Sequence, residues 1–106
     1  MSEDWSVDVK AHAPNADAKV ISGIVRYCGI ALQKKDSSLV AFSDKDEVGR
    51  VRENFLRKKL GLTQSDSELN KAIATVAERM KAAKSRNRVT VYYLLAEHFG
   101  KLTTFA

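Results

Sequence analysis

The chain has 106 residues, 44% hydrophobic and 29% charged, which is typical of one globular domain and argues against a disordered chain. Its single cysteine excludes an internal disulfide, and no apolar stretch approaches the roughly 18 residues of a membrane span. The formal net charge of +5 admits an anionic partner such as nucleic acid. We expect one domain over 1–106, loosely ordered at 1–4 and 103–106. A cytoplasmic location is expected because the acidic N-terminus lacks a signal-peptide pattern.

Residues 5–13 form the ambiguous segment of the chain. Trp5, Val7 and Val9 alternate with polar residues, as in a half-buried strand. A strand would need a partner that only one other segment offers, so we expect a short helix that ends at Pro14.

The next helix is predicted by apolar residues at three-and-four spacing, namely Val20, Ile21, Ile24, Val25 and Cys28. Asn15 or Asp17 can cap its N-terminus, and Gly29 fits the position after its end. Because Cys28 lies on the apolar stripe, we expect a buried, unreactive thiol.

Residues 36–42 carry apolar side chains and predict a short helix or a turn. Ser43 or Asp44 then caps a helix whose inner face is Val48, Val51, Phe55 and Leu56. The helix closes with the basic run Arg57, Lys58 and Lys59 before Gly61. Cations are favourable at a helix C-terminus, so this run has a structural explanation.

Two further helices are predicted after residue 64. Ser65 to Glu68 matches a capping box, and the buried stripe that follows is Leu69, Ile73, Val76 and Met80. Residues 89–93 alone favour a strand, but 94–99 have helical composition and Gly100 ends a helix, so we expect a helix over Thr90–Phe99. It is apolar nearly all round. The predicted fold is therefore all-α, a compact single-domain bundle of about five helices around this apolar C-terminal helix.

No sequence pattern predicts catalysis, a cofactor or a metal. His12, Cys28 and His98 lie far apart, and no glycine cluster or Gly-x-Ser-x-Gly motif occurs. Residues 56–65 look like the turn of a DNA-binding helix-turn-helix. However, Arg57 stands where that motif needs a small residue, and Ser67 and Asn70 stand where it needs apolar ones.

Positive charge gathers in two zones. Residues 45–62 carry six bases and three acids, and residues 84–106 carry four bases and one acid, whereas 1–17 are acidic. The candidate polyanion-binding residues are Arg57, Lys58, Lys59, Lys84, Arg86 and Arg88. Binding of single strands would also require Tyr92 and Tyr93 to be exposed for stacking, and we expect at least one of them to be buried. A solvated connection between helices is the favoured interpretation of residues 84–88.

Three strings, PNADAKVISGIVRYCGIAL, DSSLVAFSDKDEVGRVRENFLRKKLGL and RVTVYYLLAEHFGKL, resemble a family of small, mostly proteobacterial proteins catalogued only as a domain of unknown function. The resemblance extends from about Trp5 to Leu102. It implies a compact helical domain in a cytoplasmic bacterial protein, with no established activity. It also favours helix over strand at residues 5–13 and 89–93.

The expected function is a non-catalytic module that contacts another protein or a second copy of itself. Trp5, Phe42, Phe105 and one of the two neighbouring tyrosines are expected to exceed what one small core can cover, and the remainder would mark the interface. Sequence-independent nucleic-acid binding by the six cations is the alternative. No membrane partner is expected.

Overall fold

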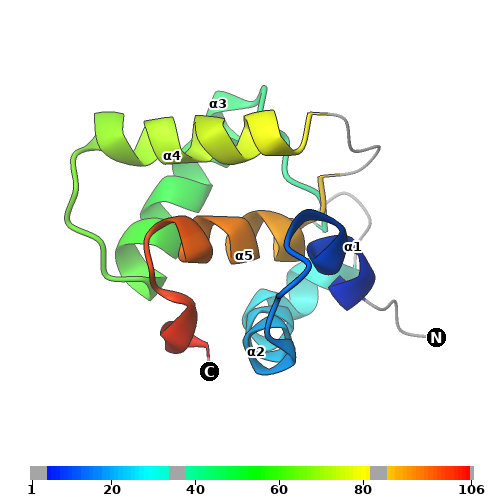
Figure 1. Cartoon of the computed structure of the whole chain (residues 1–106). Coiled ribbons are helices and arrows are strands. Elements are labelled where there is room, and N and C mark those ends of the chain that lie inside the picture. Colours follow the sequence, from blue (N-terminus) through cyan, green and yellow to red (C-terminus); the bar gives the residue numbers. More distant parts are fainter. Residues whose placement is uncertain (1–4, 34–37, 82–85, 106) are drawn as a thin grey trace.

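Helices account for nearly all the regular structure in the computed structural model, which describes residues 5–33, 38–81 and 86–105. The α-helices are α1 (Trp5–His12), α2 (Ala18–Cys28), α3 (Lys45–Arg50), α4 (Asp66–Arg79) and α5 (Arg88–His98). Three further helical segments are η1 (Gly29–Gln33), η2 (Val51–Lys59) and η3 (Leu102–Thr104). Within the described ranges the extended pairing is limited to one antiparallel bridge between Leu39 and Asn87. The predicted all-α fold is confirmed (Figure 1).

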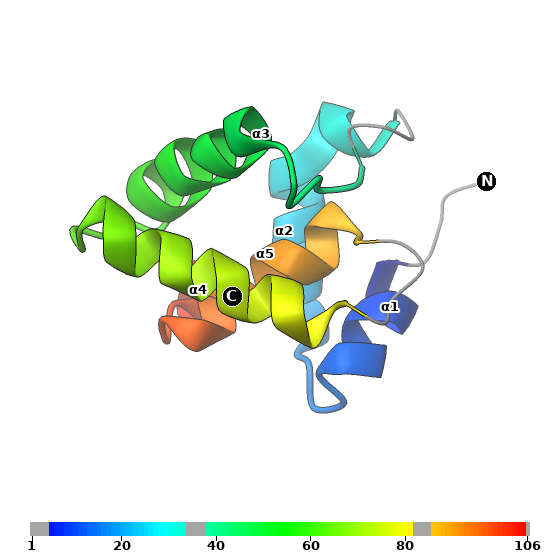
Figure 2. The same cartoon turned by 90° about the horizontal axis from the view of Figure 1, so that it is seen from above.

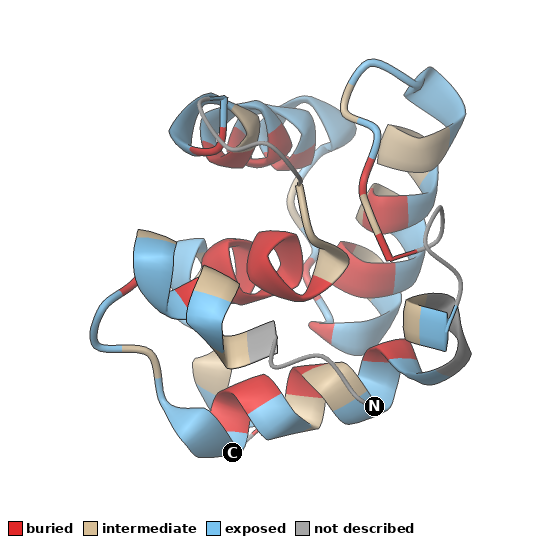
Figure 3. Cartoon of the chain, turned by 90° about the vertical axis from the view of Figure 1, so that its right-hand side faces the viewer, coloured by how far each residue is buried: buried red, intermediate tan, exposed pale blue. Residues whose placement is uncertain are grey.

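The helix α5 is the centre of the bundle, as its apolar composition predicted. It packs against α1, α2, α4 and η3 (Figures 1 and 2). All residues from Val89 to Ala96 are buried, and the buried faces of the other helices turn toward them (Figure 3). The helix begins at Arg88 rather than Thr90, because the extended Asn87 offers its carbonyl to the Val91 N–H at 2.9 Å. The two residues before Thr90 thereby join the helix.

The first two helices are tied to α5 by polar contacts as well as by packing. Residues 5–12 form a helix, so the alternative of a strand is excluded. Thr90 Oγ1 donates a hydrogen bond to the Asp8 carboxylate of α1. Asp17 is the N-cap of α2, where its Oδ1 accepts from the Lys19 N–H at 2.8 Å and its own N–H donates to the Tyr93 hydroxyl at 3.2 Å. The predicted stripe of α2 is buried at Val20, Ile21, Ile24 and Cys28.

The helix predicted after Asp44 changes its winding halfway along. Asp44 caps α3 by accepting from the backbone N–H groups of Asp46 and Glu47 at 2.9 and 3.4 Å. After Arg50 the chain continues as the π-helical η2, which closes with a hydrogen bond from the Leu60 N–H to the Phe55 carbonyl at 2.9 Å. The expectation of one regular α-helix is therefore wrong for its second half. Long π-helical segments are rare, and π-helical turns are frequent at functional sites.

The helix α4 follows its prediction closely. Ser65 Oγ accepts from the Glu68 N–H at 3.3 Å, which is the serine half of the expected capping box. Its buried residues are Leu69, Ala72, Ile73 and Val76, with Met80 buried just after it. In the described part of 36–42 the chain forms a turn, not a helix.

The end of the chain packs against α2. Phe105 is only 8% exposed, whereas 103–106 were expected to be loosely ordered; that expectation stays a prediction. The remaining ends, 1–4 and 106, lie outside the described residues. Gly23 permits this packing, because a Cβ there would lie 2.5 Å from the Phe105 carbonyl oxygen and 2.8 Å from the Phe105 Cβ.

The surface carries little apolar area over the described ranges. Phe42 is half-buried against the core, and Tyr92 and Tyr93 are both buried. The large hydrophobic side chains described as exposed are Val7 and Tyr27. The expected apolar surplus is therefore wrong for Phe105 and the tyrosines, and the Trp5 side chain lies outside the description. In the same part of the chain no helix is both long and apolar enough to cross a membrane.

Candidate functional site

The basic run at the end of η2 is partly neutralised by neighbouring acids. Arg57 forms ion pairs with Asp66 of α4 and with Glu53, whose Oε2 lies 3.3 Å from its Nε. Lys58 is exposed, and no described carboxylate lies within ion-pair distance of it. Arg57 therefore joins η2 to α4, and its charge is compensated before any ligand arrives.

Arg88 is a structural cation. Its Nη2 lies 2.7 Å from Glu47 Oε1 and 3.2 Å from the Leu39 carbonyl, and its Nη1 donates to the Tyr92 hydroxyl at 3.0 Å. The Arg88 and Glu47 side chains are only 12% and 14% exposed. This arrangement fastens the start of α5 to α3, so Arg88 is removed from the predicted polyanion surface.

The predicted cations do not form one surface. Arg88 lies beside α3, whereas Arg57 and Lys59 occupy the far end of η2. Arg86 is half-buried and donates to the Lys81 carbonyl at 3.5 Å. Lys84 falls outside the described residues. Arg88 therefore lies near the start of the segment formed by α3 and η2, and Arg57 and Lys59 lie near its end.

The aromatic rings expected to stack on bases are in the core. Tyr92 is 7% exposed and Tyr93 is 2% exposed. The Tyr92 ring stacks on Phe55 with 3.9 Å between centroids. Burial raises the pKa of the Tyr92 hydroxyl, and it raises the pKa of the Cys28 thiol to about 12. The predicted buried thiol is confirmed, and at neutral pH it is protonated and a weak nucleophile.

Lys59 belongs to a different group of residues from its neighbours in sequence. Its Nζ lies 5.3 Å from the ring centroids of both Tyr27 and Phe105. The Tyr27 hydroxyl donates to the Asn54 carbonyl of η2 at 3.2 Å, which holds the ring at the junction of α2 and η2. A cation over two aromatic faces is attracted by the ring quadrupoles.

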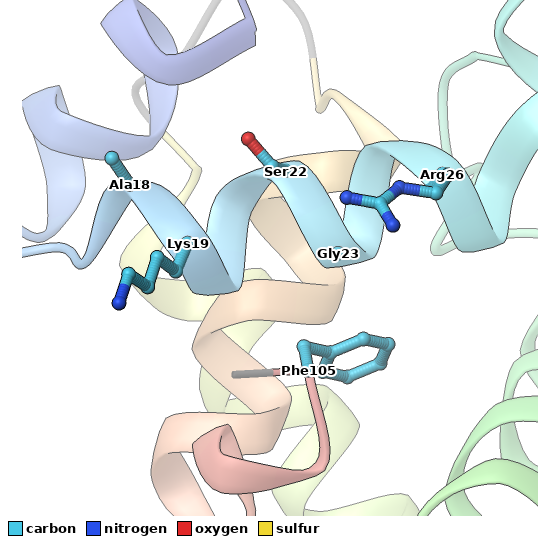
Figure 4. Close-up of a pocket in the computed structure, with 6 residues that line it drawn as sticks. All are labelled: Ala18, Lys19, Ser22, Gly23, Arg26 and Phe105. Atoms are coloured by element: carbon cyan, nitrogen blue, oxygen red, sulfur yellow. The ribbon is translucent and has the colours of Figure 1, made fainter.

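A pocket of about 490 Å³ adjoins this group, between the outer face of α2 and the chain end. Its lining is Ala18, Lys19, Ser22, Gly23, Arg26 and Phe105. Figure 4 shows Lys19 and Arg26 toward its two ends, with the Phe105 ring beside Gly23 between them. We call these six lining residues, with Lys59 over the Phe105 ring, the cationic pocket.

The charges of the cationic pocket are open to a ligand. Lys19, Arg26 and Lys59 are exposed, and among the described residues no carboxylate lies within ion-pair distance of them. Asp17 is close in sequence, but its carboxylate caps α2. An anion can therefore gain charge-assisted hydrogen bonds here without displacing an ion pair between described residues.

Sequence reasoning missed Lys19 and Arg26. A signal was present, because they stand seven residues apart on the face of α2 opposite the buried stripe, with Ser22 and Gly23 between them. Phe105 gave no such signal. Its place beside α2 depends on a chain reversal after α5 that no local pattern predicts.

Among the described residues that line the cationic pocket, the polar side chains are Lys19, Ser22 and Arg26, and none is a carboxylate or an imidazole that could act as a base for the Ser22 hydroxyl. In the described part of the chain no group of three or more His, Cys, Asp or Glu side chains is placed to hold a metal ion.

Comparison with known proteins gives a family but no activity. A family model described as "Protein of unknown function (DUF2853)" matches residues 4–103. The match includes all five α-helices and every residue of the cationic pocket except Phe105. No curated protein matches the chain.

Proposed function

The chain belongs to the DUF2853 family of proteins of unknown function, and we propose that it is a non-catalytic binding module that holds another protein at the cationic pocket. One observation carries this proposal: Lys19 and Arg26 line a pocket, Lys59 lies over the Phe105 ring that also lines it, and none of the three cations has a described carboxylate partner. Elsewhere, Arg57 and Arg88 are compensated by acids of the same chain.

A protein partner is favoured over nucleic acid by the state of the aromatic rings. Tyr92 and Tyr93 are buried, and the Tyr27 and Phe105 rings lie under the Lys59 ammonium. The two rings predicted to stack on bases, Tyr92 and Tyr93, are therefore not accessible to a nucleic acid. Arg88 also lies apart from the cations of η2. These residues therefore do not form the continuous row of positive charges that would favour binding of a nucleic-acid backbone.

The interface we propose is polar and reversible. Among the described residues, the large hydrophobic side chains that are exposed are Val7 on α1 and Tyr27 on α2. Two such side chains are too few for an obligate interface. Self-association through an apolar face therefore has less support than contact with a different protein. We also propose that the protein acts in the cytoplasm of a bacterium, because of the family resemblance and because its single cysteine, Cys28, is a free thiol.

Site-specific photo-crosslinking in the native cell tests the proposal. A photoreactive phenylalanine derivative replaces Ser22 in the cationic pocket, and in a control it replaces the exposed Ala74 of α4. The helix α4 lies across α5 from α2, so the control probes the other side of the molecule (Figure 1). A protein adduct should form from position 22, not from position 74, and Lys19→Glu with Arg26→Glu should abolish it.

Three results would reject the proposal. They are an absence of adducts from position 22, the same adducts from both positions, and adducts that nuclease removes. The last of these would support the nucleic-acid alternative.

A further inference from the structure

We infer that the partner presents an unfolded acidic segment, in which two carboxylates three residues apart contact Lys19 and Arg26. This inference rests on the proposed function and specifies the chemistry of the segment that the cationic pocket receives. Three features support it: the spacing of Lys19 and Arg26, the match of this spacing to an extended acidic segment, and the chemistry of the surface between the two cations.

The spacing follows from the geometry of α2. Lys19 and Arg26 are seven residues apart on a regular α-helix, so their backbones are separated by about 10.5 Å along the axis. They lie toward opposite ends of the cationic pocket (Figure 4). With the two side chains toward opposite ends of the pocket, as Figure 4 shows them, a ligand with two separated charges meets both cations without requiring them to bend toward each other.

A polyproline II segment has the matching repeat. It rises about 3.1 Å per residue with three residues per turn, so residues three apart project from the same side and are separated by about 9 Å. The flexible Lys19 and Arg26 side chains can adjust to the remaining difference. Unfolded chains populate this conformation strongly, so an acidic segment would reach the pocket without first forming a helix or a strand.

The surface between the cations suits the middle of such a segment. Gly23 lies between Lys19 and Arg26 and has no side chain, and the Phe105 ring lies beside it. Ser22, also between the two cations, adds only an uncharged hydroxyl, so the two central residues of the segment need no charge. Lys59, over the Phe105 ring, adds positive charge at the rim.

The two cations favour carboxylates in different ways. The Arg26 guanidinium can hold a carboxylate through two parallel hydrogen bonds, whereas the Lys19 ammonium acts as a compact point charge. Both side chains are exposed, so salt screens the attraction and binding weakens as ionic strength rises.

An NMR titration of the whole chain with synthetic peptides tests the inference. The first peptide carries Glu-Ala-Ala-Glu between prolines, the second has the two glutamates adjacent, and the third replaces both glutamates by glutamine. With the first peptide, amide shifts should concentrate at α2 and Phe105 and shrink at about 150 mM salt. The adjacent-glutamate peptide should bind several-fold more weakly, and the glutamine peptide should produce no shifts.

Matched variants separate a specific site from general charge attraction. Lys19→Glu with Arg26→Glu should weaken binding of the first peptide by about tenfold or more. The control is Lys45→Glu with Lys71→Glu, which changes the net charge equally at two exposed lysines outside the cationic pocket. It should leave binding within about twofold, because distant exposed charges are screened.

Each outcome decides between the inference and the proposed function. Equal binding of the spaced and adjacent peptides, or equal loss in the two double variants, overturns the inference. Tighter binding of a single-stranded oligonucleotide at α2 overturns it in favour of nucleic acid. If no acidic peptide binds while the adduct from position 22 persists, the inference fails and the proposed function stands. Loss of that adduct as well ends both.

Discussion

Replacing Gly23 with alanine should destabilise the protein, although alanine is the better helix former. Gly23 lies within α2, where Gly→Ala ordinarily stabilises by about 1 kcal/mol. Here the added methyl group would lie 2.5 Å from the Phe105 carbonyl oxygen and 2.8 Å from its Cβ. Both are closer than packed atoms tolerate, so the chain end must move away from α2.

The size of the effect follows from what Phe105 loses. Burying a phenylalanine side chain contributes about 1.5 to 3 kcal/mol, which is the most that its displacement can cost. Subtracting the helix gain of about 1 kcal/mol leaves a net loss of about 0.5 to 2 kcal/mol. For a domain of this size, each kcal/mol lowers Tm by about 4 to 8 °C.

Two controls isolate the contact between Gly23 and Phe105. Gly49 is also helical, but the nearest atom to a Cβ there is Arg52 Nη2 at 3.9 Å, so Gly49→Ala should stabilise by up to about 1 kcal/mol. In a chain that ends after Lys101, Gly23→Ala should likewise become stabilising by about 1 kcal/mol.

Equilibrium unfolding in urea measures the full chain, its Gly23→Ala and Gly49→Ala variants, and the shortened chain with and without Gly23→Ala. The decisive result is the change of sign when residues 102–106 are removed. If Gly23→Ala stabilised the full chain as much as Gly49→Ala does, Phe105 would not pack against α2 as described. The cationic pocket would then lack the Phe105 ring that lines it.

Three further predictions concern buried groups and helix caps. Arg88→Met should lower the free energy of unfolding by about 3 kcal/mol, because it leaves the partly buried Glu47 carboxylate with only the exposed Arg50 as a cation and removes the hydrogen bonds from Arg88 to the Leu39 carbonyl and the Tyr92 hydroxyl; urea unfolding measures this loss. Stability should fall as pH rises from about 9 toward 12, because the unfolded chain releases the Cys28 proton at lower pH than the native chain does, and Cys28→Val should remove that component. Ser65→Ala should cost about 1 kcal/mol through loss of the α4 cap, measured by thermal unfolding.

Each of these predictions has an outcome that contradicts it. A second substitution, Glu47→Met, should recover part of the Arg88→Met loss, and no recovery would refute the buried pair. An unchanged alkaline profile in Cys28→Val would refute the protonated buried thiol, as would rapid modification of native Cys28 by a thiol reagent. A Ser65→Ala variant as stable as the parent would show that the serine does not carry the cap.

The nearly complete burial of α5 was predictable because hydrophobic residues cover its whole circumference. An apolar helix of that kind has no favourable surface to present to water, whatever packs against it. The caps at Asp17, Asp44 and Ser65 were predictable for a related reason: each depends on backbone groups within three residues of the cap.

Charge pairing was much harder to predict. Arg88 and Glu47 are 41 positions apart in the chain, and only folding brings them to 2.7 Å. The six candidate cations were grouped by their neighbours in sequence, but folding separates Arg88 from Arg57 and places Lys59 over Phe105 and Tyr27. A group of like charges in sequence is therefore a poor guide to a binding surface, because the acids that neutralise it come from elsewhere.

By itself, the sequence determined the helical class, the buried faces, the caps and the central place of α5, since those features arise from side chains a few residues apart. Tertiary structure decided the π-helical winding of η2, the burial of Arg88 and the meeting of α2 with the chain end at the cationic pocket. These depend on packing between distant segments, whose free energy no local pattern encodes. Lys19 and Arg26 were visible on one face of a predicted helix. Only the return of Phe105 to that face made them the two ends of a pocket.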